Sequence, residues 1–151
     1  MTSLLPDLPS AILRIALEDL EKVSKDSLYI VNPHEWHQPQ PGINPCHVCL
    51  AGAVMAKTLK VPPSETRAPL DYDLNLRAKL KFIDSVRIQD VYEGLLGLRT
   101  ENIIQIEQKE RFAIQKRVNG TLGIYNHTLK RGEIYPDDIA KIADILEEFN
   151  L

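Results

Sequence analysis

The fold that the sequence predicts depends on one stretch, Asn44-Pro45-Cys46-His47-Val48-Cys49-Leu50-Ala51-Gly52-Ala53-Val54-Met55-Ala56-Lys57-Thr58-Leu59-Lys60. Asn44 is a residue type that caps helices, and Pro45 suits a first helical turn. The pattern therefore predicts a helix over residues 46–60. This helix is apolar nearly all round, which is typical of a buried helix. Its small residues would let neighbouring helices approach closely, and close packing is a reason to find Gly52 in a helix interior.

Apolar residues spaced three and four positions apart predict further helices on both sides of this stretch. A short apolar run at 28–31 predicts a strand or an extended linker. Residues 101–118 fit a helix capped by Thr100, which we favour, but a short β hairpin within 103–125 is the alternative. Gly97 is expected to lie in a frayed helix end. The other helices are predicted over 9–25, 72–85, 88–98 and from Pro136 onward.

Together these elements predict a mainly α protein, in which five or six helices form a compact bundle around the buried helix 46–60. The length of 151 residues predicts a single domain, residues 1–151. A net charge of −3 and a pI near 5.8 give no general attraction to nucleic acid or to anionic membranes. The longest apolar run, residues 48–56, is too short to span a bilayer. Two cysteines are too few for a disulfide scaffold, so we expect a reducing, cytoplasmic location.

Reactive side chains are concentrated in residues 34–49, which hold three of the four histidines, both cysteines and the only tryptophan. Residues 32–45 contain four prolines and are predicted to form a loop, with Trp36 covering an edge of the core. Zinc binding is one interpretation of this cluster, because thiolate and imidazole are typical zinc ligands. The candidate ligands are His34, His37, Cys46 and Cys49. Against this, the gap between the pairs is shorter, and the histidine spacing tighter, than in common zinc motifs.

Two other interpretations of the cluster stay open. Cysteines in a C-x-x-C arrangement at a helix start suit thiol–disulfide exchange, with Cys46 attacking and Cys49 resolving, but the flanking strands of a thioredoxin-like unit are not evident. A nucleophilic cysteine would need a distant base, for which His127 is the candidate. The structural interpretation is favoured: cysteine is among the most buried residue types, so both thiols would pack in the core beside Ala53.

The run Cys46-His47-Val48-Cys49-Leu50-Ala51-Gly52-Ala53-Val54-Met55-Ala56, preceded by Trp36-His37, resembles a group of small uncharacterised phage and bacterial proteins. Members of this group share a Trp-His loop followed by C-x-V-C-x-A-G-A-V-M-A. The resemblance is concentrated in residues 1–60. It implies a compact cytoplasmic protein and supplies no mechanism.

No complete catalytic signature is present, so the sequence favours a small soluble accessory protein that is not an enzyme and acts by binding a protein partner. Association with further copies of the same chain is compatible with this expectation. No cofactor is expected under this hypothesis. The alternative hypothesis is a zinc-binding or thiol-redox protein that uses His34, His37, Cys46 and Cys49.

Overall fold

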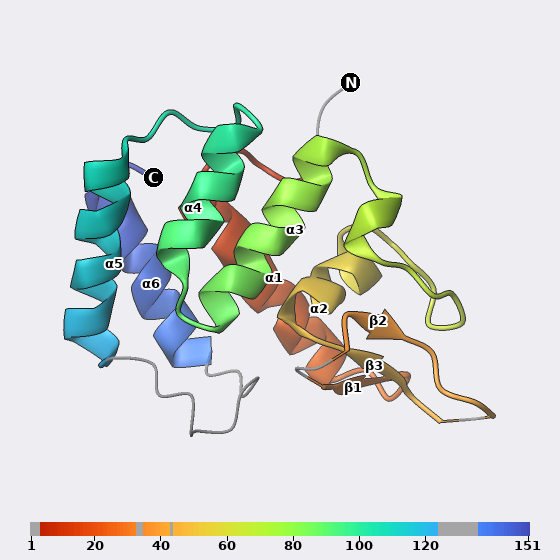
Figure 1. The fold of residues 1–151 in the computed structure, drawn as a ribbon. Helices are drawn as coiled ribbons and strands as arrows, with labels where there is room; N and C mark the ends of the chain where they lie inside the picture. The colour runs from red at the N-terminus through yellow and green to blue at the C-terminus, as the bar shows by residue number, and fades with distance from the viewer. Residues whose placement is uncertain (1–3, 33–34, 43, 124–135) are drawn as a thin grey trace.

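The computed structural model describes residues 4–32, 35–42, 44–123 and 136–151, which form a mainly helical fold (Figure 1). The prediction of a mainly α protein is confirmed. None of the described helices is both long and apolar enough to cross a membrane. In the described ranges the helices are α1 (Pro9–Ser24), α2 (Leu50–Lys57), α3 (Leu74–Arg87), α4 (Val91–Thr100), α5 (Gln108–Leu122) and α6 (Pro136–Glu148), with a 3₁₀ helix, η1, at Pro69–Asp71.

A small three-stranded sheet lies beside α2 at one end of the molecule (Figure 1). Its strands are β1 (Tyr29–Val31), β2 (His37–Gln38) and β3 (Cys46–Val48). β3 is central and pairs in parallel with β1 and antiparallel with β2. Because side chains alternate between the faces of a strand, Cys46 and Val48 are buried while His47 between them is partly exposed. Of the two alternatives for residues 28–31, the structure has the strand and not the extended linker, and the predicted loop 32–45 contains β2.

The central stretch is a strand followed by a shorter helix, so the prediction of one helix over 46–60 is wrong at both ends. Residues 46–48 fill the gap between β1 and β2, where their backbone completes the sheet. Asn44 does not cap the helix, since its side chain donates to the Pro41 carbonyl at 2.8 Å. The N-cap is Cys49. A continuous apolar run fits a buried strand and a buried helix equally well, which is why its pattern misplaced the boundary.

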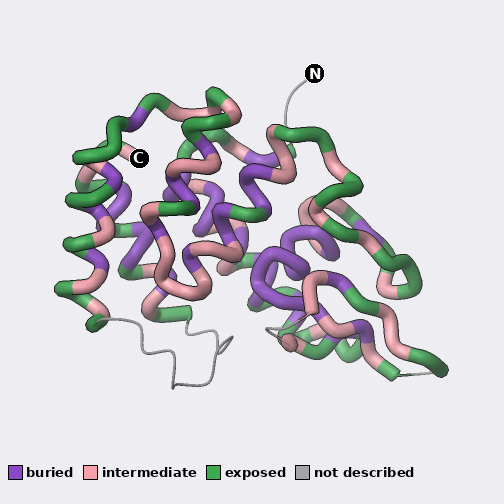
Figure 2. Tube along the Cα trace, in the orientation of Figure 1, coloured by how far each residue is buried: buried purple, intermediate pink, exposed green. Residues whose placement is uncertain are grey.

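The predicted burial of the central helix is confirmed, because Leu50 to Ala56 of α2 are all buried (Figure 2). However, α2 does not occupy the centre alone, because α1 is also packed on several sides. Helix α1 packs against α2, α3, α6 and β1, and its apolar face includes Ile12, Leu13 and Ala16, which have no exposed surface. The core therefore lies among α1, α2 and α3, and α3 has the most neighbouring elements: α1, α2, α4, α6 and η1.

Residues 101–107 are not helical, and α5 begins only at Gln108, so the prediction of a helix from 101 is wrong in its first part. Asn102 adopts a left-handed conformation with φ of 57°, which ends α4. Its amide donates to the Arg99 carbonyl at 3.0 Å, and the Ile103 amide donates to Leu98 at 2.9 Å. The alternative hairpin is also wrong where it can be judged, because residues 103–123 contain no strand; residues 124–125 lie outside the described ranges.

Candidate functional site

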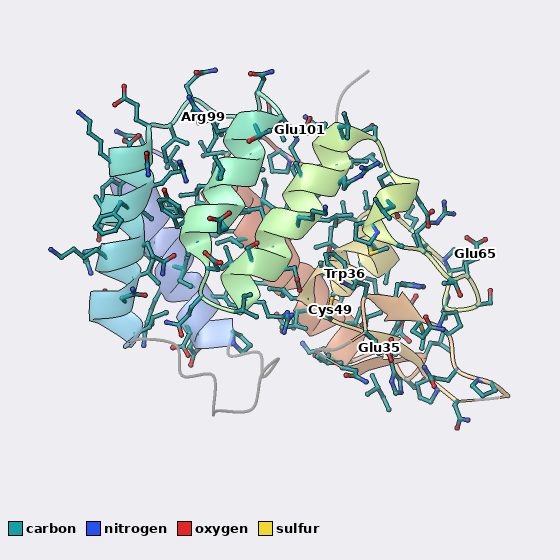
Figure 3. All side chains as sticks on the ribbon, viewed as in Figure 1. Glu35, Trp36, Cys49, Glu65, Arg99 and Glu101 are labelled. Carbon is teal, nitrogen blue, oxygen red and sulfur yellow. The ribbon has the colours of Figure 1, made fainter. Side chains whose placement is uncertain are left out.

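Three of the four predicted zinc ligands lie in the small sheet or at the start of α2, and Figure 3 shows one of them, Cys49. His37 is in β2, Cys46 is in β3 and Cys49 precedes α2. Their exposed fractions are only 2%, 2% and 1%. His34 lies outside the described residues, as does His127, the candidate base for a nucleophilic cysteine.

Cys49 joins the start of α2 to the backbone of Trp36. Its sulfur accepts a hydrogen bond from the Gly52 amide at 3.3 Å, as a serine or threonine does at an N-cap. Its thiol donates to the Trp36 carbonyl at 4.0 Å. A Cβ added to Gly52 would lie 1.4 Å from that same carbonyl oxygen. Gly52 therefore allows a backbone carbonyl, and not a neighbouring helix as predicted, to rest on the first turn of α2.

His37 and Cys46 are neighbours, but they are poorly arranged for proton transfer. The Cys46 sulfur lies 3.8 Å from Nδ1 and 4.0 Å from Nε2 of His37. Nearly equal distances to both nitrogens place the sulfur between them and not along the axis of either one. The imidazole also packs edge-on against Tyr29, with ring centroids 6.3 Å apart. The pair therefore packs as two uncharged side chains in the core.

Burial opposes the charged forms of all three groups. It raises the pKa of both thiols, Cys46 and Cys49, to about 11. It also lowers the pKa of His37, an effect that backbone hydrogen bonding at Glu65 and Val61 partly opposes. A reactive cysteine needs a lowered pKa and access to its partner, and neither thiol has them. This arrangement favours the structural interpretation over thiol–disulfide exchange.

The zinc interpretation stays a prediction. Within the described part of the chain, no three His, Cys, Asp or Glu side chains form a group that could hold a metal ion. The predicted set therefore depends on His34, which is not described. The remaining histidine of the cluster, His47, is occupied at Nδ1 by the side-chain amide of Asn32 at 3.0 Å.

A second feature, which the sequence analysis did not find, is a groove of about 470 Å³ between α3 and α4. The two helices lie side by side in Figure 1. Gly94 lets the helices approach each other, since an added Cβ would meet Phe82 and Ser85 at 2.9 and 3.1 Å. Gly97 has open space where a Cβ would point, so the missing side chain leaves the hollow. Gly97 belongs to the interior of α4, not to a frayed end as predicted.

Charged side chains of opposite sign border this groove. Arg77 and Lys81 stand on the α3 wall, while Glu93 and Glu101 stand on the α4 wall. Figure 3 shows Glu101 at the end of α4, beside the start of α3. None of the four forms an ion pair with another residue in the described ranges. The one signal for this groove in the sequence is the pair Gly94 and Gly97, two glycines inside a helix that otherwise has good helix formers.

Comparisons with protein-family models, with curated proteins and with solved structures found no match. The resemblance to phage and bacterial proteins therefore stays a prediction.

Proposed function

We propose that this protein is a non-enzymatic accessory protein that binds the helical surface of a protein partner in the α3–α4 groove. The observation that carries the proposal is the contrast between two sites. The reactive side chains of the Trp-His and cysteine cluster are buried and held in their uncharged forms. The groove is open, and the charges along its walls have no ion-pair partner among the described residues, although the Arg77 guanidinium donates to the Tyr72 carbonyl at 3.5 Å.

The walls of the groove define the kind of helix that would fit. An acidic edge of the partner would lie along Arg77 and Lys81, and a basic edge would lie along Glu93 and Glu101. Apolar contact is available at Leu74, whose side chain is 55% exposed at one end of the groove. A helix laid in a groove between two other helices is a common mode of protein recognition. Both cysteines are free, which supports our further proposal of a reducing, cytoplasmic location.

The test uses two glycines at which a bulky side chain has room. A photo-crosslinking residue at Gly97 would attach to a partner seated in the groove, whereas the same residue at Gly120, which also meets nothing within 4 Å, would sample the outer surface of α5. The attached protein is identified, purified and titrated with the wild type, Gly97→Trp and Gly120→Trp. We expect Gly97→Trp to weaken binding at least about tenfold and Gly120→Trp to leave it unchanged. A partner that binds all three proteins equally would rule out the groove.

The alternative proposal is a zinc site, and one observation favours it: His37 and Cys46, two of the predicted ligands, are in contact. Its test is elemental analysis of untagged protein purified without chelators. Stoichiometric zinc that is lost in His34→Ala would support this proposal. Metal-free, fully folded protein would eliminate it.

A further inference from the structure

The charged residues on the two walls of the groove determine which charges an occupant must carry. The α3 wall is basic and the α4 wall is acidic, so a surface with the reverse arrangement would match both. We propose that the occupant is the α3–α4 face of a second copy of this chain, so that the protein forms a two-fold symmetric dimer. This inference rests on the proposed function of the groove and names its partner.

The antiparallel packing of α3 and α4 sets which residues stand at the same height along the groove (Figure 1). Gly94 lies level with Phe82 and Ser85, as the contacts of an added Cβ demonstrate. One helical turn further along, Gly97 comes level with Lys81, and one turn beyond that Glu101 comes level with Arg77. Each cation on α3 therefore has an acidic residue on α4 at its own height or within one turn of it.

The two-fold axis of the proposed dimer runs along the groove, parallel to both helices. Such an axis places α3 of one copy opposite α4 of the other while keeping every residue at its own height. Arg77 of each copy then faces Glu101 of the other, and Lys81 comes within reach of Glu93. An axis across the helices would place α3 opposite α3, where like charges would meet. The first arrangement is therefore the one that electrostatics favours.

The floor of the groove permits the close approach that such a dimer needs. Gly97 offers no side chain, and Ala78 and Ser85 offer small ones. Leu74 and Leu96 line the same groove and provide apolar contact across the axis. The Nε atom of Arg77 is buried and has no hydrogen-bond partner among the described residues. If the Arg77 side chain turns outward, a carboxylate from the second copy would give this donor an acceptor.

The first measurement is sedimentation equilibrium of the full chain at low and at moderate salt. We expect the wild type to dimerise, more weakly as salt rises, because surface charges are screened. Gly97→Trp is expected to weaken dimerisation at least about tenfold, while Gly120→Trp leaves it unchanged. Circular dichroism and thermal unfolding verify that both variants remain folded. A wild type that stays monomeric at its solubility limit, or a dimer that Gly97→Trp does not weaken, overturns the proposal.

A charge exchange tests the symmetry itself. Lys81→Glu and Glu93→Lys change two exposed residues that are in no described ion pair, so neither should disturb the fold. Each variant alone would bring like charges together across the axis and is expected to dimerise about tenfold more weakly than the wild type. Mixed together, the two variants restore attraction at both contacts and should form a heterodimer. Two variants that dimerise as well alone as in the mixture contradict the proposed axis.

These outcomes separate this inference from the proposed function. A monomeric chain whose Gly97 crosslinks to a different protein would overturn self-association and support the groove as a binding site. A dimer that both Gly97→Trp and the charge exchange disrupt supports both. A chain that is monomeric and crosslinks to nothing at Gly97 overturns both.

Discussion

Cys49 has two structural contacts that account for a cysteine at this position without any reaction. Its sulfur caps α2 by accepting from the Gly52 amide, and its thiol donates to Trp36. The bond to Trp36 needs the protonated thiol, and burial raises the pKa of this thiol to about 11, although the bond from the Gly52 amide opposes the shift. The Trp-His and C-x-V-C-x-A-G residues therefore belong to one packing unit, in which the Trp36 backbone rests on the first turn of α2.

At this scale we predict that both thiols react slowly in the folded protein. With a pKa of about 11 for Cys46 and Cys49, the thiolate fraction at neutral or mildly basic pH is about 100-fold lower than for a thiol with the ordinary value of 9.0. Titration with a chromogenic disulfide should be at least that much slower than for free glutathione, and burial should slow it further. Both thiols should react completely in denaturant. Rapid reaction of either one in the folded state would revive the redox hypothesis.

The effect of a substitution inside a helix depends on what packs against that position. The Trp36 backbone packs against Gly52, whereas nothing lies within 4 Å of a Cβ added at Gly97. Gly52→Ala would push a Cβ into the Trp36 carbonyl. We expect it to lower the free energy of unfolding by about 3 kcal/mol or more, because a backbone segment and not a flexible side chain must move. Urea denaturation measures this loss.

Gly97→Ala is the matched control, since both residues lie inside helices and only the space around them differs. Its Cβ meets nothing within 4 Å, so alanine should raise the free energy of unfolding by about 0.5–1 kcal/mol through its higher helix propensity. Equal effects of the two substitutions would mean that Trp36 does not pack on α2.

Helix positions could be predicted from the sequence where an amphipathic pattern and a boundary signal coincide. α6 begins at Pro136 as predicted, and α1 and α3 match their patterns within two residues at each end. Prediction failed where the pattern was uniformly apolar, at residues 46–48, and where one Asn in a left-handed conformation, Asn102, ended a helix. The groove could not be predicted, because it arises from the relative placement of two helices and not from either sequence pattern alone.

The whole molecule depends on contacts between residues far apart in the chain, which no local pattern reveals. Arg14 of α1 pairs with Asp144 and Glu147 of α6. Fully buried Lys79 of α3 donates to the Leu5 carbonyl at 2.9 Å and pairs with Asp7, which fixes the segment before α1. These contacts tie α1 to α6 and tie the segment before α1 to α3.

A buried carboxylate on α1 makes the stability of the whole molecule depend on pH. Asp19 accepts a hydrogen bond from Thr58, just after α2, and its exposed fraction is 2%. Burial raises its pKa above the ordinary value of 3.8, while the Thr58 hydrogen bond and Lys22 oppose the shift. The folded state therefore binds this proton more tightly than the unfolded chain does. Ionisation of Asp19 lowers stability at pH values above its folded-state pKa, and this loss is recovered as the pH falls toward 3.8.

Asp19→Asn keeps an acceptor for Thr58 without the charge. We predict that its free energy of unfolding compares best with that of the wild type at neutral pH. The wild type should gain on the variant as the pH falls from about 7 to about 4, by about 1.4 kcal/mol for each unit by which the pKa is raised. Urea unfolding of both proteins across this range measures the difference. Thr58→Val removes a hydrogen bond that lowers the pKa, so it should make the pH dependence steeper. A difference between the wild type and Asp19→Asn that stays constant with pH would show that the carboxylate is not buried as described.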